Sequence, residues 1–197
     1  MIRNPDETRA RILRKSGVLF NTQGYKSTSI SDITTATGYT KGAIYRHFKN
    51  KAVLEKATLF HLSTLMFEKL RARIKGESTA GNKLRAVIQY FESYITHPEV
   101  KGGCPLMNAA IEADDSNPSL RKEAVKVLDI LRDSVIAILK NGIRYKQIKK
   151  ETDLEYSAAI IIASLEGAIM MSKLRRNNHD IKRIIKHLES EVKNIET

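Results

Sequence analysis

The sequence predicts an all-α fold of about nine helices, and three observations support this prediction. Apolar residues recur at three- and four-residue spacing in one segment after another along the chain. The same segments contain no strand-like alternation, no internal repeat and no low-complexity tract. Turn signals separate them, notably Gly24, Gly38, the run 76–82 and Pro98. This pattern is typical of a protein built from packed helices.

The first predicted helix begins near Asp6 or Thr8, either of which can cap it, and it ends before Gly24. Its apolar stripe consists of Ile12, Leu13, Leu19 and Phe20. Basic residues cover the remaining surface, namely Arg9, Arg11, Arg14 and Lys15. The pattern favours a solvated face for these basic side chains.

Residues 28–51 predict two short helices joined by a tight turn. Ser29 can cap the first helix, and Asp32 at the third position completes a capping box. Gly38 supplies the positive φ at the helix end, and Thr40 can cap the second helix. The second helix points Lys41, Tyr45, Arg46 and His47 outward. A short polar helix held by a neighbour indicates a helix-turn-helix over about residues 29–48.

The stretch GYTKGAIYRHFKNK resembles the signature of TetR-family transcriptional repressors, in which the second helix reads T-x-G-x-x-Y-x-H-F before x-x-K. The matching positions are Thr40, Gly42, Tyr45, His47, Phe48 and Lys51. Further matches are Phe20, Gly24, Tyr25, Thr28, Ser29 and Ile33. The resemblance is close over about the first quarter of the chain. It implies a three-helix DNA-binding domain over residues 6–66 and a helical ligand-binding and dimerisation domain over 67–197.

The resemblance also implies which residues contact DNA. They are Thr28, Ser29, Thr40, Lys41, Gly42, Ala43, Tyr45, Arg46, His47 and Lys51. Thr28 and Ser29 are expected at phosphates, and residues 40–43 at the groove, where Lys41 can donate to guanine O6 and N7. Tyr45, His47 and Lys51 resemble the family's backbone contacts. Two alternatives stay open: Tyr45 can be a packing residue, and Arg46 can point away from the duplex.

The charge distribution supports a polyanionic partner. The net charge is +12, and residues 1–51 hold ten Lys and Arg against three Asp and Glu, which gives +7. The remaining residues carry only +5. Positive charge is therefore concentrated around the helix-turn-helix. A Lys-rich composition that only favours solubility is the alternative, and it explains this N-terminal excess less well.

The later helices are predicted over about 50–74, 83–95, 105–113, 118–142, 153–175 and 180–195. Asn50 opens the first of them, and Asn117 caps the helix that has Pro118 at its first position. The segment 153–175 is apolar on nearly every face. The resemblance implies that the last two helices form a homodimer interface, which charges at Ile161 or Leu165 should break. Alternatively, these helices complete the core of one subunit.

The resemblance places a ligand pocket among the middle helices. Its candidate residues are Phe91, Tyr94, Cys104, Met107, Ile111, Leu131, Glu166 and Met170, each of which can instead be core packing. A carboxylate among apolar residues, such as Glu166, must be paired, lie on a polar seam or meet a ligand. Cys104 precedes a predicted helix, whose N-terminus stabilises a thiolate. Its segment also resembles Gly-Cys-Leu in some electrophile- and oxidant-sensing relatives, although a small buried side chain is the alternative.

Other function classes lack support in the sequence. One cysteine permits neither an internal disulfide nor a metal cluster, and the histidines show no ligand spacing. No catalytic triad, Walker loop or dinucleotide fingerprint occurs, so we expect no enzyme, cofactor or metal. The run Glu112, Asp114 and Asp115 is expected to solvate a turn, with cation binding as the alternative. The N-terminus lacks a signal-peptide core, and the run 158–171 is judged too short and polar to span a membrane. These features predict a soluble cytoplasmic protein.

Together these features predict a homodimeric TetR-like regulator, most simply a repressor that an unknown small molecule releases from a pseudo-palindromic double-stranded DNA operator. The alternatives are a redox-sensing repressor acting through Cys104 and a non-specific architectural DNA-binding protein. A helical enzyme is the third class, and it lacks a catalytic constellation.

Overall fold

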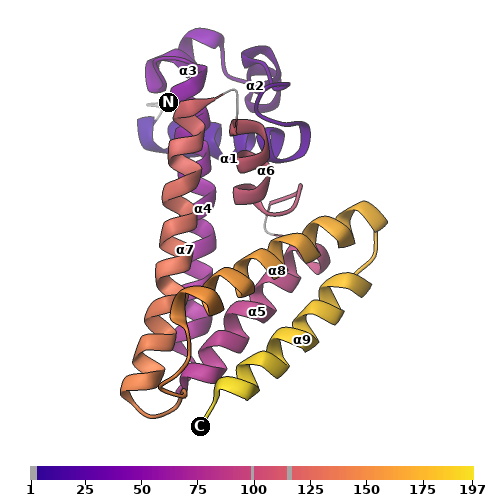
Figure 1. Ribbon diagram of the computed structural model, residues 1–197. Helices are drawn as coiled ribbons and strands as arrows, with labels where there is room; N and C mark the ends of the chain where they lie inside the picture. The colour runs from indigo at the N-terminus through magenta and orange to yellow at the C-terminus, as the bar shows by residue number, and fades with distance from the viewer. Residues whose placement is uncertain (1–3, 99, 115–116) are drawn as a thin grey trace. The chain divides into compact units, whose positions relative to one another are not determined.

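The computed structural model describes residues 4–98, 100–114 and 117–197, which form nine α-helices and no strand (Figure 1). The helices are α1 (Pro5–Gln23), α2 (Ile30–Thr37), α3 (Lys41–His47), α4 (Lys51–Lys75), α5 (Ala80–Thr96), α6 (Pro105–Ala113), α7 (Pro118–Arg144), α8 (Leu154–Arg175) and α9 (His179–Ile195). The predicted all-α fold is confirmed.

The chain forms two compact units. The first holds the described residues of Met1–Leu65 and Val100–Val127, and the second holds those of Met66–Glu99 and Leu128–Thr197. The first unit therefore includes α6 and the start of α7, which the sequence analysis assigned to the second domain. The division into a DNA-binding domain over 6–66 and a ligand-binding and dimerisation domain over 67–197 stays a prediction. The two compact units of the structure have different boundaries.

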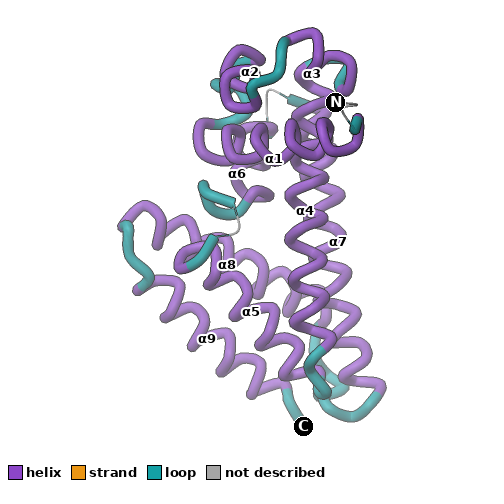
Figure 2. Tube along the Cα trace, turned by 180° about the vertical axis from the view of Figure 1, so that it is seen from behind, coloured by secondary structure: helices purple, strands orange, loops and turns teal. Residues whose placement is uncertain are grey.

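In the first unit, α1 packs against α2 and α6, and α2 packs against α3 (Figures 1 and 2). The core consists of apolar side chains from these helices and the start of α4, including Ile12, Phe20, Ile33, Ile44, Phe48 and Leu54. Gly17 permits close packing of α1, because a Cβ there would lie 2.9 Å from Leu62 Cδ2. The rings of Phe20 and Tyr25 are stacked with centroids 4.8 Å apart. The helix-turn-helix is thereby held on a small apolar core.

In the second unit, α5, α8 and α9 lie side by side (Figure 2). Their facing side chains are buried, among them Leu84, Ile88, Phe91, Leu165, Ile169, Ile181 and Leu188. Arg85 on α5 donates two hydrogen bonds to the Glu196 carboxylate, at 2.8 and 2.6 Å. This bidentate pair attaches the residue that caps the end of α9 to α5.

Helix α8 agrees closely with the helix predicted over 153–175. It spans Leu154–Arg175, and an 18-residue window of it has a mean hydropathy of 1.5, so it is long and apolar enough to cross a membrane. The run 158–171, which was judged too short and polar to span a membrane, is only the middle part of this longer helix. A core helix passes the same test, and α8 packs against α5 and α9. Ile161 and Leu165 are 6% and 0% exposed, so charges there would disrupt the subunit core and cannot test an interface.

The helix ends follow local capping rules closely. Ser29 and Asp32 form the predicted capping box, and Gly38 has a φ of 72°. The α1 cap is different, because Asn4 accepts a hydrogen bond from the backbone of Asp6. α5 begins at Ala80, three residues earlier than predicted.

Candidate nucleic-acid interface

Helix α3 presents a polar, accessible face. Its N-cap Thr40 accepts a hydrogen bond from the Ala43 amide at 3.2 Å, which fixes the start of the helix. Ile44 is fully buried, so it anchors the opposite side of the helix in the core. The positions on the open side are Lys41, Gly42, Tyr45 and Arg46, all exposed. A short helix anchored on one side in this way can enter a major groove with the other.

Gly42 has no intramolecular reason to be glycine. A Cβ at position 42 would meet no atom of the described residues within 4 Å, and the φ of Gly42 does not lie in the left-handed region. By contrast, Gly38 needs glycine for its backbone conformation, with φ at 72°. The residue type at position 42 therefore fits the close approach of something outside the chain. A DNA backbone or base edge is such a partner.

Two arginines of α1 make cation–π contacts with aromatic residues at the two ends of α3. The Arg9 guanidinium carbon lies 5.3 Å from the centroid of the Phe48 ring, and that of Arg11 lies 5.4 Å from the Tyr39 ring centroid. Tyr39 precedes the N-cap of α3, and Phe48 follows its last residue. The sequence analysis treated these arginines as a solvated face, because a cation–π partner about 28–39 positions away leaves no local signal.

The predicted DNA contacts differ in accessibility. Exposed residues are Ser29, Thr40, Lys41, Gly42, Tyr45 and Arg46, and half-buried ones are Ala43, His47 and Lys51. Thr28 is 0% exposed, and its hydroxyl donates to the Gly24 carbonyl at 2.7 Å. Its side chain therefore stabilises the turn before α2. The expected contact between this side chain and a phosphate is wrong, because the hydroxyl is buried and already donates within the chain. For the other nine residues DNA contact stays a prediction.

Lys51 has partners within the chain. Its ammonium donates to the Tyr25 carbonyl at 2.6 Å and lies 3.3 Å from the Glu55 carboxylate. The family resemblance suggested a DNA backbone contact for this residue. The internal contacts give it a structural role as well, because a buried carbonyl needs a donor.

The acidic run expected to solvate a turn has a different role at Glu112. Its two carboxylate oxygens accept the backbone N–H groups of Tyr25 and Lys26, each at 3.0 Å. Asp114 is exposed, and Asp115 lies outside the described residues. Among the described residues no group of three or more His, Cys, Asp or Glu is placed to hold a metal ion. Sequence reasoning missed Glu112 because its partners are 86 and 87 positions away.

The predicted ligand-pocket residues occupy different environments. Phe91, Tyr94, Cys104 and Leu131 are buried, whereas Met107 and Glu166 are half-buried. Ile111 and Met170 are 70% and 44% exposed, so neither lines a closed cavity within the described subunit. Phe91 and Tyr94 form an aromatic cluster with Tyr90, with centroid separations of 5.7–5.9 Å. A shared pocket for these residues stays a prediction.

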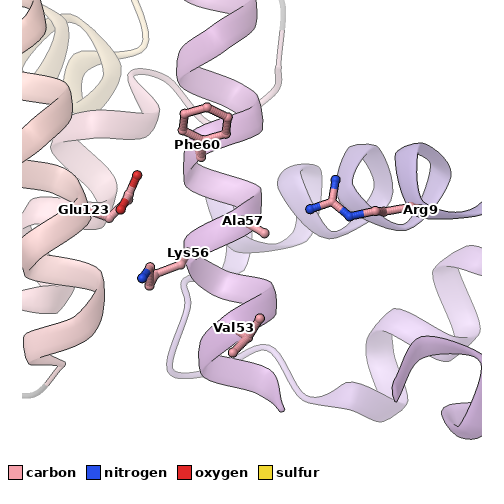
Figure 3. A pocket seen from close by; sticks show the side chains of 6 residues that line it. All are labelled: Arg9, Val53, Lys56, Ala57, Phe60 and Glu123. Carbon is pink, nitrogen blue, oxygen red and sulfur yellow. The ribbon is translucent and has the colours of Figure 1, made fainter. Parts of the chain in front are cut away.

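Two surface cavities lie in the first unit, and none of the eight pocket candidates lines either of them. One, of about 290 Å³, is bordered by Val53, Lys56, Ala57 and Phe60 of α4, with Arg9 from α1 and Glu123 from α7 (Figure 3). The other, of about 240 Å³, is lined in part by Tyr25, Lys51, Glu55 and Glu112. Burial, followed by the carboxylates of Glu112 and Glu55, raises the pKa of Tyr25 above its usual range.

Cys104 is the N-cap of α6 and is 0% exposed. Oxidants attack accessible thiolates, and this sulfur does not reach the surface of the described subunit. The burial agrees with the alternative reading of a small buried side chain. A redox sensor at this position is not favoured.

Two family models match the chain. Residues 12–58 match the bacterial regulatory proteins of the tetR family, and residues 80–188 match the tetracyclin repressor-like C-terminal domain. The second match alone covers more than half of the chain. The first covers the helix-turn-helix and the start of α4.

Three individual proteins extend the comparison over the full length. A TetR transcriptional regulator from Chloroflexus aurantiacus is 34% identical, with a TM-score of 0.93 over 98% of this chain and 97% of its own. A TetR-family regulator from Cytophaga hutchinsonii is 31% identical, with a TM-score of 0.92 over 100% and 98%. The HTH-type transcriptional repressor DhaR of Mycobacterium sp. is 23% identical over 94% of this chain and 91% of its own. The chain therefore belongs to the TetR family of bacterial regulatory proteins, and it is a DNA-binding transcriptional regulator.

Proposed function

We propose that this regulator is a homodimeric repressor that binds a pseudo-palindromic operator through α3 of each subunit. The observation that carries the proposal is the open face of α3, where Gly42 leaves room that no residue in the described part of the chain fills. The surrounding charge of +7 over residues 1–51 favours a polyanion. Repression, rather than activation, is supported by relatives such as the repressor DhaR. A regulator that binds bacterial DNA must be in the cytoplasm, so we propose a cytoplasmic location. We expect no enzymatic activity.

An exposed apolar stripe on α8 supports dimerisation. Its large members are Tyr156, Ile160, Met170 and Leu174, which are 65%, 36%, 44% and 77% exposed. Ala163 and Gly167 lie between them, so the stripe repeats at alternating spacings of four and three residues. This repeat keeps one seam facing a partner helix. The exposed face of α9 is instead mostly polar, so we assign the centre of the interface to α8 and its edges to α9.

A small molecule in the second unit is the proposed inducer. The tetracyclin repressor-like match over residues 80–188 supports a ligand-binding role for this part of the chain. A ligand can lower operator affinity only if it binds the DNA-incompetent state more tightly than the competent one. The proposed mechanism is such a population shift, which moves the two recognition helices out of register with the half-sites.

Selection from a random duplex library with the full-length protein tests the proposal. We expect enrichment of a duplex with two inverted half-sites, bound by one dimer and protected in a footprint next to the protein's own gene. Equal affinity for the selected duplex and a scrambled one of the same composition would instead indicate an architectural DNA-binding protein, the alternative that the family match does not favour.

A further inference from the structure

The turn at residues 25 and 26, between α1 and α2, is held on both sides by side chains from other helices. The N–H groups of Tyr25 and Lys26 donate to the two carboxylate oxygens of Glu112 on α6, each at 3.0 Å. Their carbonyl oxygens accept from Lys51 Nζ on α4, at 2.6 and 3.4 Å. All four backbone polar groups of the turn therefore depend on one carboxylate and one ammonium group.

Gly24 is shaped to receive the Glu112 carboxylate. Its φ is 94°, and a Cβ there would lie 2.8 and 2.9 Å from the two Glu112 oxygens. A side chain at this position would both strain the backbone and displace the carboxylate. The absence of a side chain at Gly24 therefore matches the position of the Glu112 carboxylate, although the two residues are far apart in the sequence.

A second set of contacts joins the segment that carries Glu112, residues 101–112, to the end of α1. The side-chain amide of Asn21 donates to the carbonyl oxygens of Lys101 and Gly103, at 2.9 and 3.0 Å. The side-chain amide of Asn108 on α6 donates to the Asn21 side-chain oxygen at 2.8 Å. Residues 101–112 are therefore attached to the DNA-binding helices at two separate points, one of which is Glu112.

We infer that Glu112 is a positioning residue for DNA binding: it fixes the turn that sets the direction in which the chain enters the helix-turn-helix. Ser29, which caps α2, follows Lys26 by three positions, so a shift of the turn moves α2 and the packed α3 with it. Specific binding needs the recognition helix held to a small fraction of a base-pair step. This role rests on the DNA-binding function proposed above.

The sign of the effect separates positioning from simple electrostatics. Glu112 places a negative charge in the unit that is proposed to bind a polyanion. By charge alone, its removal would leave DNA affinity unchanged or strengthen it. As a positioning residue, its removal must weaken specific binding.

The test compares Glu112→Gln with Asp114→Asn in the full-length protein. Each substitution removes one acidic charge from the same short stretch, but Asp114 is exposed and lies at the end of α6. Gln keeps the length of Glu but offers one acceptor and one donor group, so it can pair with only one of the two N–H groups. The probes are the duplex selected with the wild-type protein and a scrambled duplex, and amide hydrogen exchange at Tyr25 and Lys26 provides a second readout.

We expect Glu112→Gln to weaken binding of the selected duplex at least fivefold, with scrambled-duplex affinity and helical content retained and with faster exchange at whichever of the two amides loses its acceptor. Asp114→Asn should bind the selected duplex at least as tightly as wild type. Unchanged or tighter binding of the selected duplex by Glu112→Gln would overturn the inference while leaving the DNA-binding function intact. Failure of the wild type to select any duplex would instead reject that function. A general loss of folding would remove binding to both duplexes and lower helical content, and it would count against a positioning role.

Discussion

Lys51 Nζ and the Tyr25 carbonyl oxygen are 2.6 Å apart, so the lysine that ends the helix-turn-helix signature donates within the chain. We expect Lys51→Met to lower the free energy of unfolding by about 1–3 kcal/mol, because the carbonyl loses its donor. Selected-duplex affinity should fall together with stability. A salt titration then identifies the cause. Each lost phosphate contact flattens the slope of log affinity against log salt by about 0.9, whereas a purely internal role leaves it unchanged. We expect a flattened slope, because Lys51 is one of the predicted phosphate contacts, and an unchanged slope would limit the residue to its internal role.

Lys41 is the position where we expect direct reading of bases. It is exposed at the first residue of α3, and its ammonium lies 5.9 Å from the Tyr45 ring centroid. Lys41→Ala should cost about 1–3 kcal/mol on the selected duplex and much less on a scrambled one. Lys122→Ala, which removes one exposed charge from α7, serves as the matched control. If both variants lose affinity equally on both duplexes, Lys41 contributes only charge.

The dimer interface can be tested at Ala163. This residue is exposed at the centre of the apolar stripe on α8, so a larger polar side chain leaves the core of the subunit intact. Ala163→Glu should yield folded monomers in sedimentation, with weak operator binding because one half-site alone holds poorly. Ser190→Glu, on the exposed face of α9, should remain dimeric. A dimeric Ala163→Glu protein would move the interface away from α8.

The Arg85–Glu196 pair predicts a pH dependence in the second unit. The hydrogen bond from Arg85 lowers the pKa of Glu196 below its usual value of 4.5. A carboxyl group with a lowered pKa stabilises the folded state above its usual value, and this contribution disappears as the pH falls through the lowered pKa. Glu196→Gln should therefore reduce the melting temperature at pH 7, and the difference from wild type should shrink in acid. A difference that stays constant down to about pH 3 would exclude ionisation of Glu196 as its cause.

Sequence reasoning succeeded where the determinants are local. The caps at Ser29, Thr40 and Asn117 depend on donors within three residues, so short motifs reveal them. It failed at the start of α5, where a glycine-containing run suggested a turn. Gly81 lies inside that helix and leaves room for the Glu196 carboxylate, since a Cβ there would lie 1.7 Å from a Glu196 carboxylate oxygen. The glycine therefore reflects a partner more than a hundred positions away and not a turn.

In the candidate DNA-binding site, too, sequence reasoning found the features with local determinants and missed those that depend on distant partners. The exposed face of α3 follows from the helical period and from the family motif. The burial of Thr28 and the contacts of Glu112 and Arg9 depend on neighbours that only folding brings together. Because such partners are separated by tens of residues, a single sequence gives no sign of them.

The empty space at Gly42 has a genetic consequence. A bulky substitution there would leave the fold and the proposed dimer unaffected, since no atom of residues 4–98, 100–114 or 117–197 lies within 4 Å of the new Cβ. Such subunits would still pair with wild-type subunits in a cell that makes both, and each mixed dimer would have one obstructed recognition helix. Alleles of this kind would be dominant, whereas alleles that disrupt the core around Ile44 would be recessive, because their products never reach a partner.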